Sequence, residues 1–107
     1  MNQFGLTEAA LKVIVGKIAP HPEIEKAVIF GSRAIGNYKN GSDVDIALFG
    51  SDVSFKLTAD ISAELNEHTT QPYFFDLLNF NSIDNDDLKR HVNDFGKVIF
   101  ERSLGSH

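Results

Sequence analysis

The feature that most constrains this chain is the stretch 30–49, in which two apolar segments flank a Gly-Ser turn and an Asp-x-Asp pattern. The first apolar segment ends abruptly at Gly31 and Ser32, and the second begins with Asp43 and Asp45. Because successive side chains of a strand point to opposite faces, the two aspartates should share one face. Carboxylates about 6–7 Å apart along a strand suit a hard divalent cation. A Gly-Ser turn that leads into a short helix offers N–H groups and a hydroxyl to a phosphate, so the pattern indicates nucleotide chemistry.

Composition sets limits on the class of protein. A chain of 107 residues is expected to form one domain, residues 1–107, with a core that needs no disulfides. It has no cysteine, which excludes a thiolate metal site and a cysteine nucleophile and is compatible with the cytoplasm. No apolar run approaches the ~20 residues of a membrane span, and no signal-peptide pattern begins the chain. The net charge of −5 argues against a surface that follows a long nucleic acid.

Hydrophobic periodicity and turn residues divide the chain into alternating helices and strands. Thr7 and Ser54 stand where helix N-caps are expected. The expected elements are a helix at 8–19, a strand at 25–30, a turn or one-turn helix at 32–36, a strand at 44–49, a helix at 54–68, a strand at 73–80, a helix that begins within 82–87 and ends near 93, and an extended segment at 97–101.

A third acidic residue, Asp76, stands inside the apolar and aromatic strand 73–80. Aspartate is depleted in strands, and burying its charge is costly unless it is paired or bound to a metal. Simpler interpretations exist for the other motifs: Gly31 and Ser32 can form an ordinary capped turn, and Asp43 and Asp45 can be a turn residue and a solvated charge. Neither interpretation accounts for Asp76.

These residues together resemble a known family. The segments Gly31-Ser32-Arg33-Ala34-Ile35-Gly36 and Ser42-Asp43-Val44-Asp45-Ile46, followed by Asp76, look like the nucleotidyltransferases of the DNA polymerase beta superfamily. The short length fits its smallest branch, the minimal nucleotidyltransferase (MNT) domains. The resemblance implies an α+β, two-layer nucleotidyltransferase fold, with a small mixed sheet and helices packed on one side.

The resemblance also implies roles for individual residues. Gly31 and Ser32 would contact the phosphates of a nucleoside triphosphate, together with Arg33 and Ser42. Two Mg²⁺ ions would be bound by the three carboxylates of Asp43, Asp45 and Asp76, which would make these the catalytic residues, with ATP as the substrate. For Arg33, a solvent-exposed side chain is nearly as good an interpretation as a phosphate ligand.

The implied reaction is transfer of a nucleoside monophosphate, AMP from ATP, to an acceptor hydroxyl. MNT domains are often paired with a HEPN-domain toxin, for which they serve as antitoxin, so the acceptor is expected on a partner protein. One departure from the family is Ile35, which occupies the arginine position of the commoner Gly-Ser-x-x-Arg-Gly pattern. This residue favours the alternative of a non-catalytic binding antitoxin. A small-molecule nucleotidyltransferase completed by an oligomer is a third interpretation.

Other residues carry weaker expectations. Tyr38, in the loop between the motifs, is a candidate to stack on a base. The four histidines, His21, His68, His91 and His107, lack metal-ligand spacing and are expected at the surface. The apolar residues 4–6, Phe95 and Phe100 belong either to the core or to a partner interface.

Overall fold

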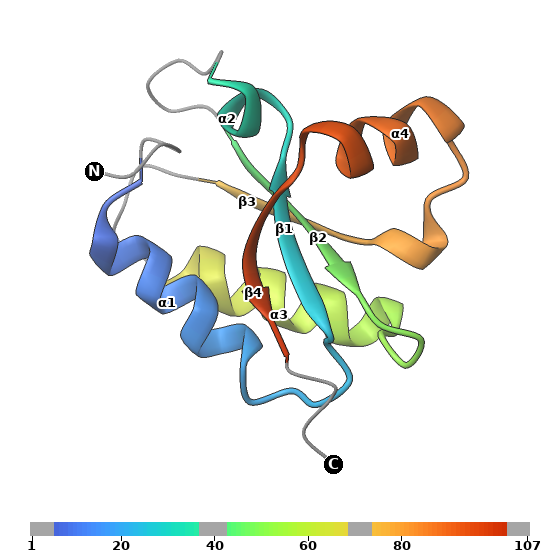
Figure 1. Cartoon of the computed structure of the whole chain (residues 1–107). Coiled ribbons are helices and arrows are strands. Elements are labelled where there is room, and N and C mark those ends of the chain that lie inside the picture. The colour runs from blue at the N-terminus through green and yellow to red at the C-terminus, as the bar shows by residue number, and fades with distance from the viewer. Residues whose placement is uncertain (1–5, 37–42, 69–73, 103–107) are drawn as a thin grey trace.

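The computed structural model describes residues 6–36, 43–68 and 74–102. Its four strands form one sheet in the order β3-β2-β1-β4 (Figure 1). The central strands β1 and β2 are antiparallel, β4 is antiparallel to β1, and β3 is parallel to β2, which makes the sheet mixed, as predicted. The strand bounds are Lys26–Phe30 for β1, Val44–Phe49 for β2, Phe75–Asn79 for β3 and Lys97–Glu101 for β4.

The helices begin where the sequence places capping residues. Thr7 accepts a hydrogen bond from the Ala10 N–H at 3.0 Å, and Ser54 accepts one from the Leu57 N–H at 3.0 Å, which confirms both predicted N-caps. The helix bounds are Glu8–Ile18 for α1, Ser32–Ile35 for α2, Phe55–His68 for α3 and Asp86–Phe95 for α4, with a 3-10 turn η1 at Phe80–Ser82.

One face of the sheet is covered by α1 and α3 and holds the main core (Figure 1). Alternate residues of each strand point into this core, as strand geometry requires. Fully buried residues come from the two helices and from the three strands β1, β2 and β3: Ile14, Ile18, Ala27, Ile29, Val44, Ile46, Leu48, Ile61, Leu65 and Phe75. This arrangement confirms the predicted α+β class.

The opposite face carries α4, which lies across the sheet from α1 and α3 (Figure 1). Val92 of α4 packs on Val28, Phe30 and Ala47 in a second, smaller core. The expectation of helices on one side only therefore holds for α1 and α3 and is corrected for α4. The physical reason is that β1 is apolar on both faces, so each face needs a cover.

Several element boundaries differ from the prediction by one or two residues. The third strand ends at Asn79 rather than residue 80, because the Asn79 side chain accepts from the Asn81 N–H at 3.1 Å and turns the chain into η1. The last helix begins at Asp86, within the predicted range, because the Asn85 side chain caps it through the Leu88 N–H at 3.1 Å; it ends at Phe95 rather than near residue 93. In the described part of the chain, no helix has the length and apolar character needed to span a membrane.

Candidate active site

The Gly-Ser turn lies where β1 ends and α2 begins. Gly31 adopts φ 77° and ψ −156°, a conformation that disfavours residues with a side chain. A Cβ atom at this position would lie 2.5 Å from Oδ2 of Asp45. Glycine is therefore required for two reasons, the backbone conformation and the close approach of the turn to a carboxylate.

The three predicted aspartates lie at one end of the sheet. Asp45 of β2 is the register partner of Asp76 on the parallel strand β3 and of Phe30 on the antiparallel strand β1. Neighbouring strands are about 4.8 Å apart, which brings the two carboxylates close together. Asp43 precedes Asp45 by two residues and alternates with the buried Val44, so strand alternation puts it on the α4 face with the other two.

The electrostatics of this cluster centre on Asp45. Burial, followed by the negative charges of Asp76 and Asp43, raises the pKa of this carboxyl from 3.8 to about 6. Asp43 and Asp76 are exposed, whereas Asp45 is half-buried beneath the Gly31 turn. Repulsion among three nearby carboxylates is the electrostatic condition that a bound cation relieves.

The donor set suits a hard cation in its chemistry. Mg²⁺ prefers carboxylate and water oxygens, and the backbone gathers three carboxylates, those of Asp43, Asp45 and Asp76, on one face. Among the described residues, no three acidic or histidine side chains are already drawn together as a complete metal-ligand group. The fit therefore rests on oxygen donors, shared face and mutual repulsion, with the exposed side chains of Asp43 and Asp76 having room to turn toward Asp45.

A residue that the sequence analysis assigned to the surface, His91, belongs to this site. Its Nε2 accepts a hydrogen bond of 2.9 Å from the Gly31 N–H, across 60 positions of sequence. The imidazole ring also contacts Phe30 and Phe95, with centroid separations of 6.3 and 5.5 Å. An Nε2 that accepts must be unprotonated, so the neutral ring carries its proton on Nδ1. This hydrogen bond ties the turn to helix α4.

A signal for His91 was present in the sequence. His91 follows Leu88 by three positions and precedes Val92 by one and Phe95 by four. This spacing places it on the apolar stripe of α4. Lys89, Arg90 and His91 form a run of three basic residues, which is typical of a solvated helix face. The sequence therefore favoured an exposed position for His91.

Other expected site residues have different positions. The Arg33 side chain is 2% exposed, so the solvent-exposed interpretation is wrong for this residue. Ile35, in place of the family arginine, is 50% exposed beside the turn. Ser42 and Tyr38 lie outside the described residues, as does the segment 1–5, whereas Leu6 is fully buried in the main core.

The mixed sheet, with its Gly-Ser turn against paired strand carboxylates, is the arrangement that the resemblance to nucleotidyltransferases implies. The family model of polymerase beta nucleotidyltransferases matches residues 12–104. The chain therefore belongs to the polymerase beta nucleotidyltransferase family, as the motifs predicted. No curated protein matches the chain at a significant level.

Solved structures of toxin–antitoxin complexes share the fold. A toxin–antitoxin structure with AMP-PNP is 21% identical, with a TM-score of 0.69 over 92% of this chain and 76% of that chain. An MntA-HepT complex is 18% identical, with a TM-score of 0.68 over 90% and 74%. A tri-AMPylated HEPN toxin in complex with MNT antitoxin, from Shewanella oneidensis, is 18% identical, with a TM-score of 0.67 over 91% and 74%.

Proposed function

We propose that the protein is a metal-dependent nucleotidyltransferase that moves AMP from ATP to an acceptor hydroxyl. The observation that carries this proposal is the packing of the Gly31 turn against Asp45, which is itself the register partner of Asp76. Membership of the polymerase beta nucleotidyltransferase family supports the reaction class.

The reaction is an in-line substitution at the α-phosphorus. The acceptor oxygen forms a new O–P bond, the bond from the α-phosphorus to the bridging oxygen breaks, pyrophosphate leaves, and the hydroxyl proton is released. The protein's contribution is to position the reactants and to neutralise charge. Bound divalent cations, with Mg²⁺ expected, would be held by Asp43, Asp45 and Asp76 and would supply neutralisation of the triphosphate and a lower pKa for the acceptor hydroxyl.

The turn residues divide between structure and nucleotide binding. The Gly31 N–H donates to Nε2 of His91, so we assign Gly31 first to holding the turn against α4. Within the described residues, no group bonds the Ser32 hydroxyl, which is half-buried at the start of α2 and is assigned to the phosphate. Ser42 and Arg33 are retained as nucleotide-binding residues. Asp76, exposed on an edge strand, is the carboxylate that an acceptor meets first.

The proposed acceptor is a hydroxyl on a partner protein, a HEPN-domain toxin, for which this chain would act as antitoxin. The support is the fold shared with an MNT antitoxin found in complex with a tri-AMPylated HEPN toxin. A toxin–antitoxin complex of the same fold with AMP-PNP supports an adenine nucleotide. The alternative, a binding antitoxin without catalysis, is favoured by the exposed apolar Ile35 beside the turn.

Transfer of label from ATP radiolabelled at the α-phosphate tests the proposal. The wild-type chain with Mg²⁺ and a purified HEPN partner should label that partner, and Asp45→Asn should reduce labelling roughly 1,000-fold, because the carboxylate cluster loses its central member. Asp52→Asn is the matched control, since Asp52 is an exposed turn residue at the far end of β2 and should retain full activity. Circular dichroism checks that each variant is folded.

The two candidate functions give opposite results in this assay. No label with the wild-type chain, together with equal inhibition of the toxin by wild type and Asp45→Asn, would overturn catalysis and support the binding antitoxin. Label that Asp45→Asn leaves unchanged would overturn the proposed site.

A further inference from the structure

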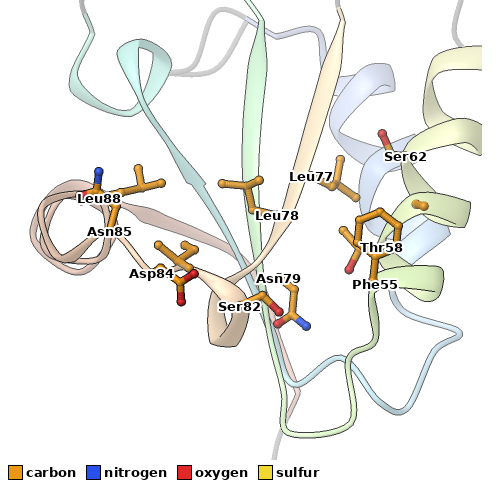
Figure 2. Close-up of a pocket in the computed structure, with 12 residues that line it drawn as sticks. Phe55, Thr58, Ser62, Leu77, Leu78, Asn79, Ser82, Asp84, Asn85 and Leu88 are labelled. Atoms are coloured by element: carbon orange, nitrogen blue, oxygen red, sulfur yellow. The ribbon is translucent and has the colours of Figure 1, made fainter.

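The outer edge of β3 borders a second hollow of the surface, and none of the three predicted aspartates lines it. It is a mainly apolar cavity of about 630 Å³ between the first turns of α3, the edge strand and the start of α4. Figure 2 shows its lining residues, with Phe55 and Thr58 of α3 on one side of β3 and Leu88 of α4 on the other. The volume is within the range of about 300–1,000 Å³ typical of ligand sites.

The wall of this cavity includes an open strand edge. The Val44 N–H donates to the Phe74 carbonyl at 2.8 Å, so residues 74, 76 and 78 direct their backbone groups toward β2. Phe75 and Leu77 therefore direct theirs outward. At Phe75 the Asn66 side chain satisfies both groups, accepting from the N–H at 2.8 Å and donating to the carbonyl at 3.0 Å.

Leu77 has no such cover. Within the described part of the chain, no side chain or strand bonds its outward N–H and C=O groups, which lie at the cavity wall. Buried backbone groups without partners cost free energy, and a strand edge of this kind pairs readily with another extended chain. Two residues earlier, at Phe75, the Asn66 carboxamide shows what such a partner supplies, a donor and an acceptor on the same side.

The side chains around the edge suit an extended peptide. Leu77 and Leu78 point to opposite sides of β3, toward α3 and α4 respectively (Figure 2). A strand added at this edge would direct alternate side chains into the same two apolar spaces. Phe55 at the rim is 86% exposed, and a large unpartnered aromatic side chain is typical of a protein contact.

The charge around the cavity indicates which charged residue a bound segment should carry. Asp84 is the one charged residue among those that line the cavity. The exposed Asp86 follows it in the first turn of α4. A basic residue in the bound segment would complement this end of the cavity, and an acidic one would be repelled.

We propose that the β3 edge binds an extended segment of a partner protein, which adds a strand beside Leu77, places apolar side chains on both sides of the edge and carries a basic residue near Asp84. This mode is strand addition, in which main-chain hydrogen bonds supply affinity and alternate side chains supply specificity. The proposal does not rest on the transfer reaction, because Asp43, Asp45 and Asp76 are not among the residues that line the cavity.

Selection from a phage-displayed library of short random peptides on the immobilised chain tests the proposal. Enriched peptides should alternate apolar residues with a lysine or arginine toward one end. Ala59→Arg fills the cavity from an exposed helical position and should weaken binding of a synthesised enriched peptide at least about tenfold. Ala63→Arg is the matched control, since it is exposed one turn further along α3 and outside the lining, and should leave affinity unchanged.

Main-chain recognition has its own readout. Backbone N-methylation of the peptide should abolish binding at the alternate positions that face Leu77 and have no effect at the positions between them. The proposal is overturned if selection enriches no peptide that Ala59→Arg weakens, or if N-methylation has no positional effect. It is also overturned if sedimentation shows a wild-type dimer that only Ala59→Arg dissociates, because the occupant is then a second copy of the chain.

Discussion

The two faces of the sheet differ in the side chains that they carry. The face toward α1 and α3 is covered along its length by apolar side chains that solvent does not reach. The face toward α4 is apolar only in the middle, where Val92 packs on Val28 and Ala47, and acidic at one end. The same strands supply both faces, since alternate residues of β2 and β3 enter the main core and the carboxylate cluster.

The difference shows where stability and function are located. The main core has no titratable group, so its contribution to folding is hydrophobic burial. The acidic end holds Asp45 with its pKa raised to about 6 by burial and by like charges, an arrangement unfavourable to the charged form. Strain of this kind is expected at a site whose ligand brings the compensating charge.

The largest expected effect is on the free energy of unfolding, and it should differ between two adjacent phenylalanines that lie on opposite faces. Phe75 is fully buried in the main core, and Phe74 is 54% exposed beside the acidic end. Phe75→Ala should lower the free energy of unfolding by about 3–5 kcal/mol, and Phe74→Ala by less than about 0.5 kcal/mol. Urea denaturation followed by circular dichroism measures both. Equal losses would show that the two faces contribute alike.

The next effect separates a close contact from a backbone conformation. Gly31 and Gly36 both have positive φ, 77° and 80°, but only Gly31 lies against Asp45. Each substitution to alanine should cost about 1–3 kcal/mol of stability. In the transfer assay Gly31→Ala should also reduce the rate about 100-fold, because it displaces the carboxylate by an ångström or so, and Gly36→Ala should have a far smaller effect. Similar rates for the two variants would contradict the role of the Gly31–Asp45 contact.

A smaller effect is expected where α4 holds the turn. His91→Phe keeps the ring contacts with Phe30 and Phe95 and removes the acceptor for the Gly31 N–H. The rate of transfer should fall about tenfold, the equivalent of about 1.4 kcal/mol. His91→Gln offers a side-chain oxygen in place of Nε2 and should restore most of the activity. If the Phe and Gln variants behave alike, packing rather than the hydrogen bond positions the turn.

Local patterns were enough to predict most of the fold. The caps at Thr7 and Ser54, the bounds of β2 and the order of elements depend on residues close in sequence. The shared face of Asp43 and Asp45 follows from strand alternation alone. The pairing of Asp45 with Asp76 was expected only through the family resemblance, because no local rule sets the order of strands in a sheet.

What the sequence did not predict depends on contacts between distant segments. The bond from Gly31 to His91 joins positions 60 residues apart, and it follows only once α4 is placed on the second face. The burial of Arg33 likewise requires the packing of α2, a four-residue helix with little periodicity of its own. The cavity at β3 has no sequence motif, since three elements contribute one side each.

The smallest effect concerns the pH dependence of stability and isolates the strain at Asp45. Its folded-state pKa of about 6 lies above the ordinary 3.8, so the folded state binds the proton more tightly than the unfolded state. Stability from this group is therefore fully present below about pH 4 and is lost as the pH rises to about 6. Asp45→Asn cannot ionise and should escape this loss.

The comparison is made in EDTA, so that no divalent cation relieves the repulsion. Because solvent reaches the Asp45 carboxylate, we expect Asp45→Asn to exceed wild type by about 1 kcal/mol at pH 7.5 and to match it near pH 4. Denaturation midpoints across this range give the difference curve, and Asp52→Asn should give a flat one. Added Mg²⁺ should stabilise wild type more than Asp45→Asn at pH 7.5. A flat difference curve for Asp45→Asn would mean that the acidic end is no more strained than the surface around it, and the contrast between the two faces would then be one of packing alone.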